Sequence, residues 1–431
     1  MTIVERAQEA RKASFSLATT SSDTRNRALE AMAAALEART DDIIRINNDD
    51  YERSVSENLP GPLLKRLKFD SDKISQVIEG IRSLIHMDDP VGECKMATEL
   101  EPGLDLYRIS CPIGVTGIIF ESRPDALVQI SSLCLKSGNA VLLKGGSEAS
   151  GTNRILSSII AEATEHAGIP AGWIQLVETR ADVNEMFTLN EYIDLLIPRG
   201  SNSFVKYIME HSSIPVLGHS DGICHIYIHE DADLDKINPI VIDSKTQYVA
   251  ACNTVETLLV HKNRAAAVLP SLKRALDAAG VELCGCEETC RIIDIAPASD
   301  EDWATEYVDY KLSVRIVEGL ADAVDHINRY GSGHTDAILT EDENTASAFM
   351  AKVDASSVFW NCSTRFSDGF RYGFGAEIGI STSKIHARGP VGMEGLMIYK
   401  YKLLGKGQTV ASFSSGDKKF THRKLDRNCP L

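Results

Sequence analysis

The chain has 431 residues, of which 43% are hydrophobic and 25% charged, an ordinary globular composition that supports a full hydrophobic core. Its 45 Lys and Arg residues and 61 Asp and Glu residues give a formal net charge of −16. This balance argues against a nucleic-acid-binding protein, although a local basic pocket can still hold an anionic substrate. The length predicts about three domains or one large enzyme with subdomains.

The N-terminal segment does not resemble a targeting signal. Residues 1–17 carry acidic side chains early and lack the apolar core of a secretory signal. Nowhere do eighteen apolar residues follow one another, so no transmembrane helix is predicted. Ten cysteines without a secretory signal indicate reduced thiols rather than a disulfide framework. We therefore expect a cytoplasmic enzyme that binds neither membranes nor nucleic acid.

Residues 1–87 have helical patterning. Apolar residues recur at helical spacing after Thr24, with Asp23 as the predicted cap. A second helix, predicted over residues 71–86, ends before Pro90, which cannot continue it.

From Leu104 onward, short apolar runs typical of β-strands alternate with helical patterns over residues 126–136 and 152–167. These runs are LYRIS, GVTGIIF, AVLLKG, IQLV, IDLLIP, PVLG and CHIYI. A second αβ segment begins near residue 227, with TLLVH, RIVEG, AILT and SVFWN as predicted strands. The alternation predicts an α/β fold with two parallel-sheet domains covered on both faces. The polar tail, residues 414–431, is predicted to be disordered.

The sequence contains neither of the common nucleotide-binding fingerprints, G-x-G-x-x-G after a strand or G-x-x-x-x-G-K-[ST]. Two other strand–glycine–helix junctions remain, at Lys144-Gly145 and at Gly200-Ser201. Glycine lets the backbone approach a ligand, and the following helix N-terminus offers N–H groups to an anion. From these residues alone, each junction is either an ordinary βα turn or a cofactor-binding turn.

Cys252 is the candidate nucleophile. Ala250 and Ala251 leave room for a substrate beside it, and Asn253 offers a neutral donor next to the sulfur. A thiolate there could attack an acyl carbon while nearby N–H groups stabilise the oxyanion. A buried structural cysteine is the alternative, because that is the commonest role of a free cysteine.

No metal site is predicted. Cys284, Cys286 and Cys290 lie close together, but a zinc site needs four ligands and only three sulfurs are present. The remaining polar candidates are three histidines (His219, His225, His334) and a hydroxyl-rich segment with three basic residues (Lys384, His386, Arg388). Hydroxyls beside a guanidinium suit phosphate or carboxylate binding, and a solvated loop is the alternative.

The chain resembles the γ-glutamyl phosphate reductases (glutamate-5-semialdehyde dehydrogenases) of the aldehyde dehydrogenase superfamily, from about residue 10 to about residue 412. The most specific match is V-x₅-A-V-x-H-I-x₂-Y-G-S-x-H-T-D-x-I over residues 317–338, which fits the family signature. Other similar segments are FESRPDALVQI, KSGNAVLLKGG, IPRGSN, IPVLGHSDGICHIYI, ACNTVETLLVH and GAEIGISTSKIHARGPVG. Some of these also resemble the reductase half of bifunctional pyrroline-carboxylate synthases. We expect a stand-alone reductase, because no kinase-like segment precedes them.

The resemblance implies three structural parts. They are an NADP-binding domain (1–92, 110–226 and 396–405), a catalytic domain (227–395) and a small β oligomerisation flap (93–109 and 406–413). Flaps of this superfamily pair across subunits, so a homodimer or a dimer of dimers is expected.

The resemblance also implies roles for single residues. Cys252 matches the family nucleophile, and Lys144 matches the lysine that holds the adenosine ribose. Gly200 and Ser201 match the turn beside the pyrophosphate, and Glu306 matches the glutamate that holds the nicotinamide ribose. The implied cofactor is NADPH, although no residue here distinguishes it from NADH.

One departure from the wider superfamily is informative. Hydrolytic members carry Glu-Leu-Gly-Gly, whose Glu activates water, whereas residues 217–222 here read LGHSDG without a Glu. A reductase must keep water from its thioester, so the loss of this base is chemically reasonable. Where hydrolytic members place a Pro-Trp-Asn oxyanion donor, this chain has ESRP with Arg123, which could serve either the phosphate or the oxyanion.

The implied reaction is NADPH-dependent reduction of γ-glutamyl phosphate to glutamate 5-semialdehyde with release of phosphate, in proline biosynthesis. The Cys252 backbone N–H and Asn253 are expected to hold the oxyanion. The anionic acyl phosphate is expected to contact the available cationic and imidazole groups (Arg123, Lys384, His386, Arg388, His219, His225, His334). Glutamate 5-kinase is an expected supplier of this labile substrate. A hydrolytic aldehyde dehydrogenase, an acylating dehydrogenase using coenzyme A and a non-catalytic binding protein remain as alternatives.

Overall fold

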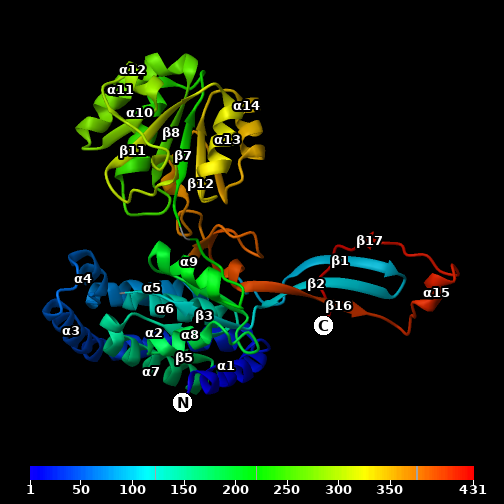
Figure 1. Ribbon diagram of the computed structural model, residues 1–431. Coiled ribbons are helices and arrows are strands. Elements are labelled where there is room, and N and C mark those ends of the chain that lie inside the picture. Colours follow the sequence, from blue (N-terminus) through cyan, green and yellow to red (C-terminus); the bar gives the residue numbers. More distant parts are fainter. Residues whose placement is uncertain (122, 220, 375–376) are drawn as a thin grey trace.

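The computed structural model describes residues 1–121, 123–219, 221–374 and 377–431. They form two α/β domains and an antiparallel flap that extends to one side (Figure 1). Both domains contain a parallel sheet, as the alternation of strands and helices predicts. The central strands β3 (Val115–Ile119) and β4 (Ala140–Lys144) are buried along their whole length, because helices cover both faces of their sheet.

The first domain has the strand order β5-β4-β3-β6. The two outer strands are β5 (Ile174–Leu176) and β6 (Leu195–Pro198). Its helices are α1 (Ile3–Leu17), α2 (Ser22–Ala38), α3 (Thr40–Ser56), α4 (Gly61–Leu67), α5 (Ser71–Ile85), α6 (Pro124–Lys136), α7 (Ser150–His166), α8 (Arg180–Met186) and α9 (Asn202–His211). The helical patterning of the first 87 residues is confirmed.

The predicted cap of α2 is wrong by two residues. The Ser21 side chain, rather than Asp23, accepts a hydrogen bond from the Thr24 N–H, at 3.3 Å. Ser21 has the extended backbone that a helix cap requires, whereas Asp23 already lies in the first turn. In the first turn, the negative charge of Asp23 still interacts favourably with the positive end of the helix dipole.

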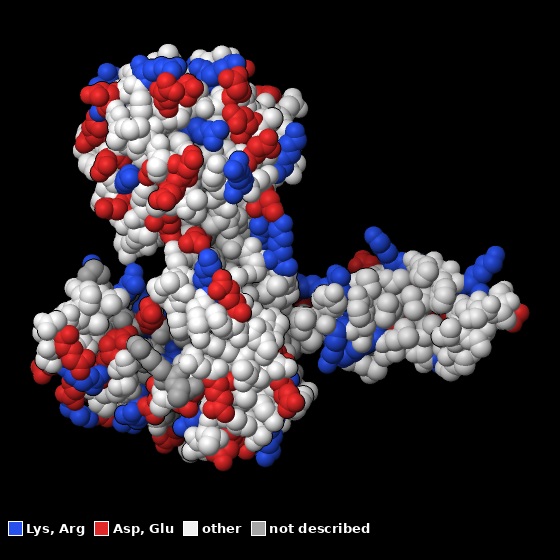
Figure 2. Space-filling model, viewed as in Figure 1, with Lys and Arg blue, Asp and Glu red and all other residues white. Residues whose placement is uncertain are grey.

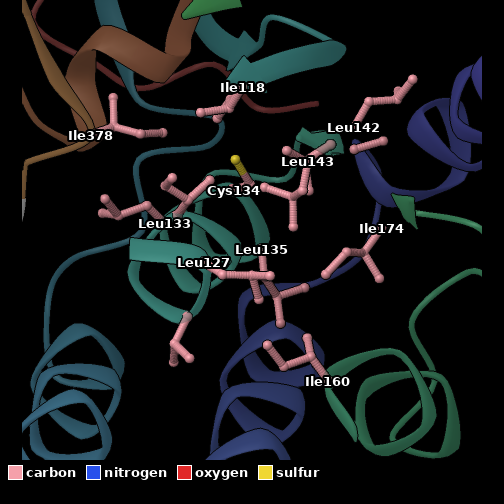
Figure 3. Close-up of a cluster of buried hydrophobic side chains, with 14 of the residues drawn as sticks. Ile118, Leu127, Leu133, Cys134, Leu135, Leu142, Leu143, Ile160, Ile174 and Ile378 are labelled. Atoms are coloured by element: carbon pink, nitrogen blue, oxygen red, sulfur yellow. The ribbon is translucent and has the colours of Figure 1, made fainter. Parts of the chain in front are cut away.

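The core of the first domain also includes chain from beyond residue 377. Figure 3 shows Ile378 near Leu133 of α6, within the same cluster of apolar side chains. Leu396 is a member of this core too. A short antiparallel pair, β14 (Gly379–Ser381) and β15 (Gly389–Val391), lies in this part of the chain. The predicted boundary at residue 395 is therefore too late, because the chain after 377 already packs on the first domain.

The second domain has the strand order β10-β9-β11-β8-β7-β12-β13. The strands are β7 (Cys224–Ile228), β8 (Val255–His261), β9 (Glu282–Gly285), β10 (Ala296–Pro297), β11 (Lys311–Val317), β12 (Thr335–Leu339) and β13 (Ser357–Trp360). The helices are α10 (Leu234–Thr246), α11 (Lys262–Ala278), α12 (Glu287–Ile292), α13 (Leu320–Tyr330) and α14 (Glu343–Lys352). All four predicted strands of this segment overlap β8, β11, β12 and β13.

The flap is a four-stranded antiparallel sheet in the order β16-β2-β1-β17. β1 (Cys94–Glu101) and β2 (Leu104–Pro112) form a hairpin, in which Gly103 takes the left-handed conformation with a φ of 83°. β16 (Met397–Leu404) pairs with β2 over its whole length. The prediction that residues 396–405 return to the NADP-binding domain is therefore wrong for β16.

The C-terminal tail is ordered, contrary to the prediction. After the short helix α15 (Ala411–Ser414), strand β17 (Arg423–Lys424) pairs with β1. The side chain of Arg423 forms an ion pair with Glu99 at 2.7 Å, and Lys418 forms one with Glu101 at 2.9 Å. The basic residues that suggested disorder thus neutralise acidic residues of β1.

Candidate active site

The loop between α10 and β8 presents Cys252 at the edge of the second domain. The Thr254 hydroxyl donates to the Tyr248 carbonyl at 2.8 Å, and this bond closes the loop. Asn253 is buried and donates from Nδ2 to the Ser367 carbonyl at 2.7 Å. Cys252 as a residue is partly exposed.

A histidine contacts this sulfur. His334, just before β12, places Nε2 3.1 Å from Cys252 Sγ. Its Nδ1 lies 2.8 Å from the hydroxyl of Thr335. Burial and, to a lesser extent, neighbouring His219 lower the pKa of His334 to about 3. The imidazole beside the thiol is therefore neutral.

His219 completes a group of three side chains. Its ring stands edge-on to that of His334, with ring centroids 5.2 Å apart, and its Nδ1 lies 3.0 Å from the Ile380 carbonyl. Because a carbonyl only accepts, this contact places the ring proton on Nδ1. Burial lowers the pKa of His219 as well.

The thiol itself is protonated in the resting state. Burial, together with the nearby carboxylates of Glu306 and Glu377, raises the pKa of Cys252 to about 12, although Arg365 acts in the opposite direction. A thiol beside a neutral imidazole can transfer its proton to Nε2 only as a new bond to sulfur forms.

Gly222 allows the chain before β7 to approach Cys252. A Cβ at this position would lie 2.2 Å from the carbonyl oxygen and 2.4 Å from the Cα of Cys252. It would also lie 2.6 Å from a carboxylate oxygen of Glu306. On the other side, Cys224 donates from Sγ to the Cys252 carbonyl at 3.2 Å. Residue 220 lies outside the described residues.

Two arginines near the thiol were not predicted from the sequence. Arg199 follows the buried strand β6, and its charge acts on Arg123, Glu377 and Cys252. Arg365 is 8% exposed and donates from Nε to Gln247 at 2.9 Å. Arg199 directly follows a fully apolar strand, and a cation at such a position is the sequence signal that could have identified it.

The predicted substrate-binding cations form ion pairs with two different carboxylates. Arg123 forms an ion pair with Asp125 at 3.0 Å and lies near Arg199. Lys384 and Arg388 both form ion pairs with the carboxylate of Asp354, and the distance from Arg388 is 3.0 Å. Their role in substrate binding stays a prediction.

Two of the predicted histidines form hydrogen bonds away from the thiol. The Nε2 of His386 lies 2.9 Å from the Gly395 carbonyl, and its part of the chain packs on the first domain. His225 is fully buried within the sheet, where Nδ1 lies 2.9 Å from the Asp336 carboxylate. The structure contradicts a substrate contact for His225, because the side chain is enclosed between β7 and β12.

A cavity of about 540 Å³ lies at the carboxyl ends of β3 and β4 in the first domain. Lys144 is nearly buried and donates to the Gly145 carbonyl. The cavity is lined by Leu59, Leu63, Ile119, Phe120, Glu121, Lys144, Gly145, Gly146, Ser147, Glu148, Glu178, Val183, Asn184 and Phe204. Its place at the carboxyl edge of a parallel sheet and its glycine-lined wall fit a dinucleotide.

The second glycine turn borders the same region. A Cβ on Gly200 would lie 3.2 Å from Phe204 and 3.3 Å from the Glu121 carboxylate, both of which line the cavity. Ser201 is exposed at the start of α9. Glu306 lies between the domains, where it accepts a hydrogen bond from Asn202. Lys144 and Gly145 thus line this cavity, Gly200 borders it, and Glu306 lies beside Gly222 near the Cys252 backbone.

The cysteines around β9 do not converge on a metal. Cys284 contacts the Tyr307 hydroxyl at 3.5 Å, Cys286 accepts from the Ile316 N–H at 3.4 Å, and Cys290 donates to the Gly285 carbonyl at 3.5 Å. Among the described residues, two other groups could hold a metal ion, His219–Cys252–His334 and His229–Glu230–His261.

A buried ion pair lies beneath the site. Lys245 of α10 and Glu256 of β8 are 0% and 1% exposed, and they are joined at 2.6 Å. Burial raises the pKa of Glu256 to about 8 and lowers that of Lys245. Glu256 also accepts a backbone hydrogen bond from Tyr307, which follows Glu306 in sequence.

Within the described parts of the chain, no helix has the length and apolar character to cross a membrane.

The model of the aldehyde dehydrogenase family matches residues 2–310. The γ-glutamyl phosphate reductase of Acetivibrio thermocellus is 64% identical over 431 residues, covering 100% of both chains. That of Pelotomaculum thermopropionicum is 61% identical over 99% of both. A crystal structure of the Thermotoga maritima γ-glutamyl phosphate reductase superposes with a TM-score of 0.93 at 39% identity, covering 95% of this chain and 100% of that one. The chain belongs to the aldehyde dehydrogenase family and, within it, to the γ-glutamyl phosphate reductases.

Proposed function

We propose that Cys252 is the nucleophile with which this chain reduces γ-glutamyl phosphate to glutamate 5-semialdehyde, a step of proline biosynthesis. The observation that carries this proposal is the contact of 3.1 Å between Cys252 Sγ and the neutral His334. An acyl phosphate carries its own leaving group, so the thiol needs a proton acceptor but no strong general acid.

In the first step, the sulfur of Cys252 attacks the acyl carbon and its proton passes to Nε2 of His334. The C–O bond to phosphate breaks, and the proton then leaves with the phosphate. The guanidinium groups of Arg199 and Arg365, both near Cys252, supply positive charge for the anionic substrate. The Cys252 backbone N–H is the proposed oxyanion donor, a contribution of about 3 kcal/mol.

When bound, NADPH would supply the hydride that brings the thioester to the aldehyde level. As the C–S bond breaks, the Cys252 thiolate leaves and takes a proton from solvent, which restores the resting thiol. The short stretch before Gly222 contains no glutamate at the place where hydrolytic members carry the one that activates water.

The cavity beside Lys144 is the proposed adenosine site, with Gly145, Gly200 and Ser201 near the pyrophosphate and Glu306 near the nicotinamide ribose. NADPH rather than NADH is supported by Arg66, whose charge acts on Glu121 of the cavity wall. A guanidinium there suits an additional phosphate. We expect Arg66→Ala to raise the KM for NADPH several-fold and to leave the KM for NADH unchanged.

A homodimer formed through the flap is part of the proposal. β16 is an edge strand, and four of its large side chains are exposed, namely Ile398, Tyr399, Tyr401 and Leu403. Figure 2 shows that much of the visible face of the flap carries no charge. The unpaired backbone groups of an edge strand, flanked by large exposed side chains, can pair with a strand of another chain. Supply of the labile substrate by a cytoplasmic glutamate 5-kinase belongs to the same proposal.

The test is the reverse reaction, in which glutamate 5-semialdehyde, NADP⁺ and phosphate are mixed and the absorbance of the reduced nicotinamide is followed. We expect phosphate-dependent reduction that Cys252→Ala abolishes and that Cys290→Ser, a control at an unrelated thiol, retains. Turnover without phosphate would indicate a hydrolytic dehydrogenase. A requirement for coenzyme A in place of phosphate would indicate an acylating dehydrogenase.

A further inference from the structure

We propose that His219, Cys252 and His334 form a binding site for a thiophilic divalent cation such as Zn²⁺, which blocks the nucleophile reversibly. One ligand atom from each residue lies within 4.8 Å of the other two. With Zn–S and Zn–N bonds of about 2.3 and 2.0 Å, a tetrahedral zinc site has N···S separations of about 3.5 Å. The contact of 3.1 Å between His334 and the sulfur is close to this value. Small side-chain movements are therefore sufficient to admit the ion.

The hydrogen bonds of the two imidazoles suit metal binding. His219 directs its Nδ1 proton to the Ile380 carbonyl, so the lone pair on Nε2 is available. The Nδ1 of His334 contacts the Thr335 hydroxyl, while Nε2 faces the sulfur. Metal-binding histidines characteristically direct the second ring nitrogen to a carbonyl or another polar group in this way.

The thiol must lose its proton when the ion binds. The S–H bond breaks, an S–Zn bond forms, and the proton passes to solvent. Cys252 is partly exposed, and water is the expected fourth ligand of a site with three protein ligands. The carboxylates of Glu306 and Glu377 act on the thiol from nearby and favour a cation, whereas Arg365 opposes it.

The other groups of potential ligands are less suited. In the set His229–Glu230–His261, Nδ1 of His261 already accepts the Asn263 N–H at 3.1 Å, so a metal would have to displace a helix cap. That set also contains no sulfur. The thiols of Cys284, Cys286 and Cys290 are each engaged with separate partners. The set around Cys252 therefore combines the softest ligand with two available nitrogens.

Blocking of turnover rests on the proposed function, because it requires Cys252 to be the nucleophile, but binding of the ion does not. The test is therefore a titration of the metal-free enzyme with Co²⁺ alone, without substrate. Co²⁺ replaces Zn²⁺ and reports a thiolate ligand through a near-ultraviolet charge-transfer band. We expect this band in the wild type and in the control Cys286→Ser, and its loss in Cys252→Ser. The variants His219→Ala and His334→Ala should bind at least about tenfold more weakly.

A parallel assay of the forward reaction should show inhibition by Zn²⁺ that EDTA reverses and that the acyl phosphate substrate opposes. A cobalt band that persists in Cys252→Ser, or one that disappears in Cys286→Ser, would overturn the proposed site. Absence of the band in wild-type enzyme that turns over substrate would do the same. A normal cobalt band in an enzyme without turnover would instead contradict the proposed function and leave the metal site standing.

Discussion

Asn202 of the first domain donates a hydrogen bond to Glu306 of the second, so side chains of both domains meet beside Cys252. Asn202 is exposed, and its removal leaves no cavity. We expect Asn202→Ala to raise the KM for the nicotinamide cofactor about tenfold, because a hydrogen bond to a charged group contributes roughly 1.5 kcal/mol. The free energy of unfolding should stay unchanged in urea titrations. Lys206→Ala, on the exposed face of the same helix, is the control, and an equal effect there would contradict this role.

The protonation of Cys252 predicts how its reactivity depends on pH. Because burial raises its pKa to about 12, the thiolate fraction is small at neutral pH and increases tenfold with each pH unit. The rate of alkylation by iodoacetamide should therefore rise continuously between pH 7 and pH 10. A plateau near pH 7 would show a thiolate–imidazolium pair and contradict the neutral pair described above. The cysteine labelled should be identified by mass spectrometry, with Cys252→Ser as the blank.

Gly222 permits the close approach of two backbone segments at the site. A methyl group there would overlap the backbone of Cys252, so Gly222→Ala must displace the nucleophile. A displacement of about 1 Å costs roughly 100-fold in rate, and we expect kcat to fall by at least that factor. Gly80→Ala is the matched control, because a Cβ there has no neighbour within 4 Å. This helical position should gain about 1 kcal/mol of stability without a change in kcat.

The buried pair of Lys245 and Glu256 predicts a large and asymmetric effect on stability. Glu256→Ala leaves a buried lysine without its partner and should reduce the free energy of unfolding by about 3–5 kcal/mol. The double variant Lys245→Met, Glu256→Leu removes both charges and should recover most of this loss. Urea titrations measure both values. A double variant as unstable as the single one would mean that the pair contributes through more than its charges.

Removal of the C-terminal tail tests the ordered flap. Without residues 414–431, the edge of β1 is exposed and the buried carboxylate of Glu101 loses Lys418. We expect much faster proteolytic cleavage within residues 94–112, measured by mass spectrometry of the fragments. A chain that lacks only residues 426–431 retains β17 and should resist cleavage like the intact protein. Equal resistance of both truncated chains would contradict a role for the tail.

The sequence predicted the parallel sheets well, because their apolar strands are buried on both faces and read as continuous runs. It predicted β16 poorly, since the alternation of Tyr and Lys in this strand gives no sign of its partner β2, almost 300 residues earlier. The prediction of a disordered tail was wrong because basic residues of the tail pair with acidic residues of β1, far away in the sequence. Within the site, the sequence pattern identified Cys252 and His334 as separate candidates. Their contact and the nearby Arg199 and Arg365 depend on tertiary packing, which local spacing does not report.

The raised pKa of Cys252 has a consequence for the survival of the enzyme under oxidative stress. Hydrogen peroxide oxidises thiolates rather than thiols, and damage beyond the sulfenic acid is not readily repaired. A nucleophile that stays protonated until its substrate arrives is therefore a poor target for peroxide. If Cys252 is the nucleophile as proposed, the arrangement around Cys252 and His334 limits the thiolate to the moment of attack, and the sulfur of an idle enzyme stays reduced.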